Sequence, residues 1–267
     1  MSDPLAAVGK GTYNLLDYFG GLSVQIWTSA RALPAAMPLI GNKYRWKESV
    51  RQMMQIGVDA LPMVVLMSFC SGFILALQGA GELRKVGAIT FVVNLVAIGF
   101  TRELGPLITA LAVSGRSGSA FSAEIGTMVV TEEMDALRVM AFEPVEFVLA
   151  PKFLATLVAV PCLSIFANLS GILAGGIFMF FTAHLPPEQF VKYTLDSIQM
   201  KDIVSGLIKS LAFATVIVQV GCFEGFRVRG GPEAVGVATT AAVVKSTFLV
   251  IIVDGIFTAI FYFMGIS

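Results

Sequence analysis

Five long apolar runs constrain the fold of this chain more than any other feature of its sequence. They cover residues 56–80, 87–113, 153–182, 203–225 and 241–265. The hydrocarbon core of a bilayer is about 30 Å thick, and a helix needs roughly 20 mostly apolar residues to cross it. Only 13% of the residues are charged, against about 25% in soluble domains. The sequence therefore predicts one all-α integral membrane domain over residues 1–267, with five transmembrane helices.

The segment before the first apolar run, residues 1–55, has a different character. Its stretches "NLLDYFGGLSVQIWTSARAL" and "NKYRWKESVRQMMQIG" interleave aromatic and basic residues with apolar ones. Such a mixture suits a helix that lies on an anionic membrane surface. We therefore expect an interfacial helix, or elbow, before the first transmembrane helix.

Lysine and arginine are distributed unevenly between the two sides of the predicted bundle. With a cytoplasmic N-terminus, twelve of them lie in inner segments and only Arg84, Lys85, Lys192 and Lys201 lie outside. Inner loops of membrane proteins carry the excess of positive charge. The sequence thus predicts a cytoplasmic N-terminus and, after five crossings, a C-terminus on the outer side.

The longest inner connection, residues 116–150, is rich in helix-forming residues between positions 120 and 140. A proline follows Glu143 and favours a helix end there, because the residue before proline avoids the α region. We expect an amphipathic helix at the cytoplasmic surface. Its charges fit either a solvated face or a docking surface for a cytoplasmic partner, and composition does not separate the two. The charged residues concerned are Glu124, Glu132, Glu133, Asp135 and Arg138.

Four charged residues, Arg102, Glu103, Lys209 and Asp254, lie deep within the apolar runs, where each costs roughly 2.5–3.5 kcal/mol on insertion scales. Counting 1.5 Å per helical residue places Lys209 about 10 Å and Asp254 about 15 Å from the outer ends of their helices. These depths predict an ion pair between the two helices. Arg102 and Glu103 are sequence neighbours whose side chains diverge on a helix, so each needs its own partner or both share an aqueous cavity.

The dipeptide Gly105-Pro106 directly follows these two charges and is expected to weaken the helix. Irregular backbone at membrane depth is tolerated where it is buried in protein or lines a cavity. Charges next to such a break indicate a substrate path more than a structural clamp.

Catalytic motifs are missing from the sequence. It has no P-loop, no HExxH and no GxSxG pattern, and its one histidine and three separate cysteines give no nucleophile–base set or metal site. The formal net charge is zero, so there is no global argument for nucleic-acid binding. We expect a protein that is not an enzyme and that holds no metal or cofactor of its own.

The stretch "TRELGPLITALAVSGRSGSAFSAEIGTMVVTEEMDALRVM" at 101–140 resembles the permease subunits of the Mla/YrbE family of ABC transporters. Further similar stretches are "SGFILALQG" at 71–79, "PKFLA" at 151–155 and "LIKSLAF" at 207–213. The resemblance extends in order over residues 45–265. It implies a homodimer in the bacterial inner membrane, with the C-terminus in the periplasm.

The resemblance also implies partners and a substrate. A cytoplasmic ATPase subunit, carrying ATP and magnesium, would dock on the coupling segment 116–150. This segment begins with Arg116 and contains the helix expected at 120–140. A periplasmic Mce-domain protein would sit over the outer mouth, with a small STAS-type accessory protein as a further partner. The substrate would be phospholipid or a similar lipid. Residues that match the family's lipid pathway by position are Arg102, Glu103, Lys209 and Asp254, with Leu75, Gln78 and Leu104 at the cavity wall.

The leading interpretation is therefore the lipid-transporting permease subunit of an ABC transporter. The alternative is an ATP-independent channel or secondary transporter, in which Glu103, Lys209 and Asp254 would act as an ion or proton relay. Flux driven by a gradient, without a partner protein, would favour that alternative.

Overall fold

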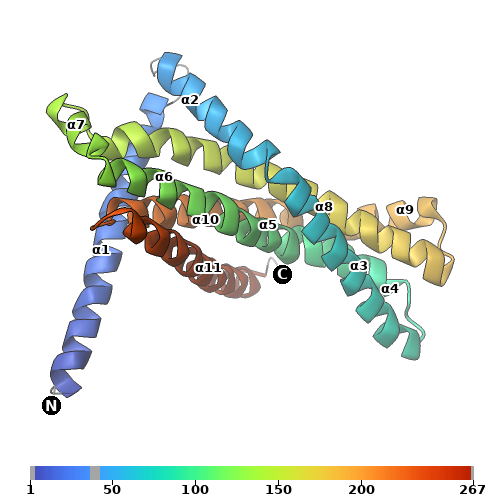
Figure 1. Cartoon of the computed structure of the whole chain (residues 1–267). Coiled ribbons are helices and arrows are strands. Elements are labelled where there is room, and N and C mark those ends of the chain that lie inside the picture. The colour runs from blue at the N-terminus through green and yellow to red at the C-terminus, as the bar shows by residue number, and fades with distance from the viewer. Residues whose placement is uncertain (1–3, 37–42, 266–267) are drawn as a thin grey trace.

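The computed structural model describes residues 4–36 and 43–265, and all regular structure in these two ranges is helical (Figure 1). The helices are α1 (Pro4–Ala36), α2 (Lys43–Met53), α3 (Leu61–Lys85), α4 (Phe91–Gly99), α5 (Gly105–Val113), α6 (Ser119–Val130), α7 (Glu133–Val139), α8 (Ala150–Ala183), α9 (Pro187–Ser197), α10 (Met200–Phe226) and α11 (Pro232–Phe263). Four π-helical turns connect some of them: η1 (Met54–Val58), η2 (Phe100–Leu104), η3 (Ser114–Gly118) and η4 (Val145–Leu149).

Several of these elements join end to end into five helices that are long and apolar enough to cross a membrane. They are Trp46–Lys85, Phe91–Val130, Val145–Ala183, Met200–Phe226 and Pro232–Phe263. This confirms the predicted all-α fold with five transmembrane helices and a preceding N-terminal helix. The first three are 39 or 40 residues long, so they extend well beyond the predicted apolar runs.

The predicted interfacial region 1–55 is divided between two elements, and its residues 1–3 and 37–42 lie outside the described ranges. Only α1 stands apart, at a steep angle to the other helices (Figure 1). The α2 helix continues through η1 into the first transmembrane helix. The basic, aromatic stretch at 43–53 is therefore the first part of a long helix that the π turn keeps continuous, and its location at the membrane surface stays a prediction.

The amphipathic helix predicted from 120 to 140 is two helices. Its first half, α6, extends the second transmembrane helix and buries Phe121, Ser122 and Ile125 against α10 and α11. Glu132 then adopts a left-handed backbone conformation, with φ of 61°, which a continuous right-handed helix excludes. The short α7 follows as a separate element.

The predicted weakness at Gly105-Pro106 does not break the second transmembrane helix. Proline lacks the N–H that an α-helix interior requires. The preceding π turn η2 absorbs this loss, since the Gly105 N–H bonds to the Phe100 carbonyl five residues back. Such single π turns are frequent at functional sites, and this one contains both Arg102 and Glu103.

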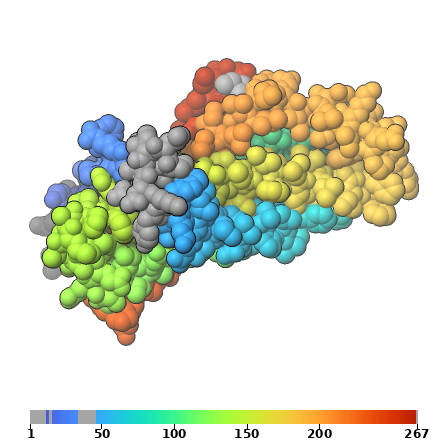
Figure 2. All heavy atoms as spheres, turned by 90° about the horizontal axis from the view of Figure 1, so that it is seen from above, coloured from blue at the N-terminus to red at the C-terminus, as the bar shows by residue number. Residues whose placement is uncertain are grey.

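The two ends of the bundle carry different structures. Figure 1 shows α7 and the start of α2 at one end, and α9 with the α3–α4 turn at the other. The first end corresponds to the predicted cytoplasmic side. Seen from above, α8 lies between α3 and α10 (Figure 2). The α9 helix begins at Pro187, directly after Pro186.

Small residues allow these helices to approach closely, as is common between membrane helices. A Cβ atom at Gly72 would lie 2.2 Å from the carbonyl oxygen of Gly171. One added to Gly171 would lie 2.1 Å from the ring of Phe100, whose side chain is fully buried. The contact between α3, α8 and η2 therefore requires glycine at both positions.

Replacing Gly171 with alanine should destabilise the protein by about 1–3 kcal/mol, the usual cost of overpacking. The matched control is Gly81→Ala on α3, where nothing lies within 4 Å of the added carbon. The measurement is the thermal unfolding midpoint in detergent. Equal midpoints for the two variants would contradict the close packing at Gly171.

Candidate functional site

The ammonium group of Lys209 lies at the centre of a charged cluster between three transmembrane helices. It donates hydrogen bonds to Glu103 Oε2 on η2, to Asp254 Oδ1 on α11 at 3.0 Å and to Thr258 Oγ1 at 2.8 Å. These three bonds use all three donors of a lysine. The predicted Lys209–Asp254 ion pair is thus confirmed. We call these four residues the Lys209 network.

Arg102 has a different partner from that of its neighbour. Its Nε lies 2.5 Å from Asp202 Oδ1, and the Asp202 side chain is almost fully buried. Asp202 also accepts a bond from the Gln199 N–H and forms a capping box at the start of α10. The sequence leaves two possibilities for these adjacent charges, separate partners or a shared aqueous cavity. In the structure Arg102 pairs with Asp202 and Glu103 pairs with Lys209.

The Lys209 network combines a buried cation with partly open carboxylates. The side chain of Lys209 is 1% exposed, whereas those of Glu103 and Asp254 are 36% and 17% exposed. Two carboxyl groups therefore share one ammonium group. Charges at membrane depth usually face a bundle interior or a water-filled cavity. In this network the lysine side is buried, and the side with the two carboxyl groups is partly exposed.

The three predicted cavity-wall residues do not join the network directly. Leu75 and Leu104 pack against the apolar cluster that contains Phe100 and Val96. Gln78 is exposed on α3, and within residues 4–36 and 43–265 it makes no hydrogen bond or ion pair with the network.

Two of the six predicted coupling residues hold helices together at the end of the bundle that the sequence predicts to be cytoplasmic. Arg116 pairs with Asp59 at 3.3 Å and bonds to the Gln55 carbonyl at 3.1 Å. Glu124 accepts a 2.6 Å bond from Lys152, which is almost fully buried. These contacts explain the two charges structurally, without a partner protein.

The other four predicted coupling residues lie on or beside α7. They are Glu132, Glu133, Asp135 and Arg138. Buried Met134 and Leu137 anchor this helix to the bundle, while Val139 is 88% exposed. Met140 and Phe142 are also exposed just beyond it. The end of α7 thus presents an apolar edge beside its charges.

A polar clamp that the sequence interpretation missed fixes α1 to α10. Gln25 donates to the carbonyl and side-chain oxygens of Gln219, and Gln219 donates to Ser29 Oγ at 2.6 Å. All three side chains are buried. The only sequence signal was the single glutamine within the apolar run at 203–225.

Next to this clamp, Tyr18 of α1 lies among charges of α10 and α11. Lys245 Nζ lies 4.7 Å from the centre of the Tyr18 ring and bonds to Glu224 at 2.8 Å. Burial, and then the nearby Glu224 carboxylate, raise the pKa of the Tyr18 hydroxyl far above its usual value of 10. The phenol therefore stays neutral and serves as a packing and cation–π surface.

A five-helix bundle around a partly open network of intramembrane charges defines a multi-pass membrane protein of the transporter class. The family described as "Permease MlaE" matches residues 49–260, and the chain belongs to this family of ABC-transporter permeases. The family has no catalytic activity, which agrees with the prediction that the chain is not an enzyme.

Individual relatives cover most of the chain. A probable ABC transporter permease protein of Rickettsia bellii is 31% identical over 256 residues, 96% of each chain. The intermembrane phospholipid transport system permease protein MlaE of Haemophilus influenzae is 36% identical over 217 residues, 81% of this chain and 83% of the relative. The chloroplastic protein TRIGALACTOSYLDIACYLGLYCEROL 1 of Arabidopsis thaliana is 31% identical over 245 residues, 92% of this chain and 69% of the relative.

Replacing Lys209 with methionine should lower the free energy of unfolding by about 3 kcal/mol, because it leaves two carboxylates without their cation. Adding Glu103→Gln and Asp254→Asn to this variant should restore part of the loss. The control is Lys192→Met on the exposed face of α9. Denaturant unfolding in detergent measures the difference, and equal stabilities for the two single variants would contradict the central place of Lys209.

Proposed function

We propose that this chain is the membrane-spanning subunit of an ABC transporter that moves phospholipid, or a similar lipid, between the inner membrane and a periplasmic Mce-type carrier. The observation that carries the proposal is the Lys209 network. It places a fully bonded cation and two partly exposed carboxylates among helices that are otherwise apolar. An amphiphilic substrate needs such a polar surface next to hydrocarbon. The Haemophilus influenzae relative is a phospholipid transport permease, which supports the same substrate class.

The open side of the network supports a homodimer. Beyond Val250, α11 exposes apolar residues such as Ile251, Ile256 and Phe263 on the same segment as Asp254. A second copy packed on this segment would cover apolar surface and enclose the exposed carboxylates. The lipid pathway would then lie between two subunits, and Arg102 would support its wall through Asp202.

The energy source in this proposal is a separate ATPase subunit that binds ATP and magnesium on the cytoplasmic side. We place its docking site on α7, which lies at one end of the bundle (Figure 1) and ends in exposed Val139 and Met140. ATP binding would shift the dimer toward a closed state only if that state binds the partner more tightly. Membership in an ABC-transporter permease family argues against the ATP-independent channel.

The remaining parts of the proposal concern the cellular setting. We place the chain in the inner membrane of a bacterium, with a cytoplasmic N-terminus and a periplasmic C-terminus. The distribution of lysine and arginine and the bacterial relatives support this placement. A periplasmic Mce-domain protein would lie over the α9 end of the bundle. A small STAS-type protein would complete the complex, with outer-membrane lipid balance as its role.

Replacing Glu103 with alanine should slow lipid transfer about tenfold, as expected when a charge-assisted hydrogen bond worth about 1.5 kcal/mol is lost. The assay follows a fluorescent phospholipid between vesicles that contain the reconstituted complex and acceptor vesicles. Glu82→Ala, at an exposed ion pair with Lys85, should leave the rate unchanged. Wild-type transfer by the Glu103 variant in an intact complex would assign these charges a purely structural role.

Replacing Val139 with aspartate should reduce co-purification of the ATPase about tenfold, since a charge then enters the apolar edge of α7. Reversing the charges of Glu132, Glu133 and Asp135 together should also reduce co-purification of the ATPase. Val86→Asp is the control, because Val86 is also strongly exposed, at 73%, but lies at the opposite end of the bundle. Undiminished recovery of the ATPase with both α7 variants would refute docking at α7.

A further inference from the structure

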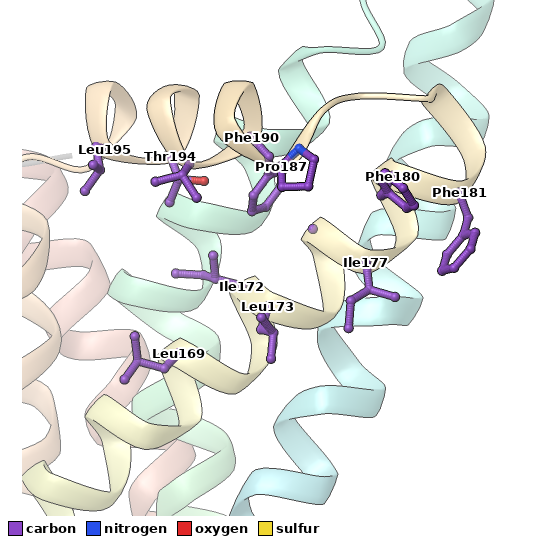
Figure 3. Close-up of a pocket in the computed structure, with 12 residues that line it drawn as sticks. Leu169, Ile172, Leu173, Ile177, Phe180, Phe181, Pro187, Phe190, Thr194 and Leu195 are labelled. Atoms are coloured by element: carbon purple, nitrogen blue, oxygen red, sulfur yellow. The ribbon is translucent and has the colours of Figure 1, made fainter.

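A groove between α8 and α9 lies outside the pathway described above. It has a volume of about 470 Å³. In Figure 3, Leu169, Leu173 and Ile177 form its α8 wall, and Phe190, Thr194 and Leu195 extend toward it from α9. None of its lining residues belongs to α10 or α11, which hold Lys209 and Asp254. Apart from the Thr194 hydroxyl, every lining side chain is purely hydrocarbon.

The position of α9 fixes the level of the groove in the membrane. Glu188, Lys192 and Asp196 recur at every fourth residue and are exposed, while Phe190 is buried against the bundle. A helix with one charged and one apolar face lies in the interface between water and hydrocarbon. The groove below α9 is therefore at the depth of the acyl chains of the nearer leaflet.

The dimensions of the groove match one leaflet. Its α8 wall extends from Leu169 to Phe181, which is about 18 Å along a helix axis. Half of the hydrocarbon core of a bilayer is about 15 Å. An extended acyl chain lying along α8 would thus contact this wall over nearly its whole length.

One polar atom lies in the α9 wall of the groove. Thr194 Oγ1 is shielded from solvent and has no hydrogen-bond partner among the described residues. A threonine in a helix commonly donates to the carbonyl four residues back, as Thr101, Thr127 and Thr215 do in this protein. An unbonded buried hydroxyl costs about 1–3 kcal/mol, and an acceptor from a ligand would remove this cost.

We propose that the α8–α9 groove is a binding site for one acyl chain of a glycerolipid from the adjacent leaflet, with an ester carbonyl of the lipid accepting a hydrogen bond from Thr194. The carbon lining recognises the chain, and the single hydroxyl recognises the ester at the depth where the glycerol region begins. This site lies on the outer surface of α8. It is independent of the transport pathway and of its proposed substrate.

The test uses tryptophan fluorescence of the full chain purified in detergent, with brominated phosphatidylcholine as the quencher. Leu173→Trp places the reporter at the mouth of the groove. Ile74→Trp on α3 is the matched control, since it is similarly exposed and similarly far from the outer end of its helix. The parent chain, which contains only Trp27 and Trp46, supplies the background signal.

Half-maximal quenching at position 173 should need about tenfold less lipid than at position 74, which corresponds to about 1.4 kcal/mol of preferential binding. Adding Thr194→Val, which keeps the shape but removes the hydroxyl, should raise the lipid required at position 173 about fivefold. Ile177→Trp provides a second reporter where the first variant does not fold.

Three results would overturn the proposal. Equal quenching at positions 173 and 74 would mean ordinary, non-selective lipid contact. An unchanged quenching curve at position 173 after Thr194→Val would show that Thr194 does not bond to the lipid ester. A reporter at 173 that stays unquenched while the one at 74 is quenched would mean that protein, and not lipid, covers the groove.

Discussion

The bonding of the Lys209 ammonium group is the interaction on which the middle of this structure depends. It connects η2, α10 and α11 through three hydrogen bonds, at a depth where an unpaired charge would be prohibitive. Because all three donors are used, the lysine cannot serve a ligand without releasing one of its present partners. Within this network, the polar groups left to contact a substrate are therefore the partly exposed carboxyl oxygen atoms of Glu103 and Asp254.

The π turns explain how the chain brings these groups together without breaking its helices. The turns η1, η2 and η3 each join two α-helical segments within the first two transmembrane helices, and η4 begins the third. The turn at η2 compensates for Pro106 and redirects Arg102 and Glu103 toward two different segments of α10. A regular helix would require a different position for one of these partners.

The sequence contained the five transmembrane helices and the Lys209–Asp254 pair, because both depend on local hydropathy and on depth along a helix. It did not reveal the partner of Arg102, since Asp202 lies at the very start of α10, where the apolar run has not yet begun. The division of residues 120–140 was also hidden. It depends on the left-handed turn at Glu132 and on burial of Phe121 and Ile125 by helices distant in sequence.

The α10 helix carries buried polar connections along almost its entire length. Asp202 holds Arg102, Lys209 holds Glu103 and Asp254, Gln219 holds Gln25, and Glu224 holds Lys245. Rotation of α10 about its own axis would break all of these connections at once, whereas a tilt that carries its neighbours along preserves them. The α10 helix and its bonded neighbours therefore move together as one rigid body. A displacement near Glu224 would also displace Lys209, which lies about 22 Å away along the helix axis.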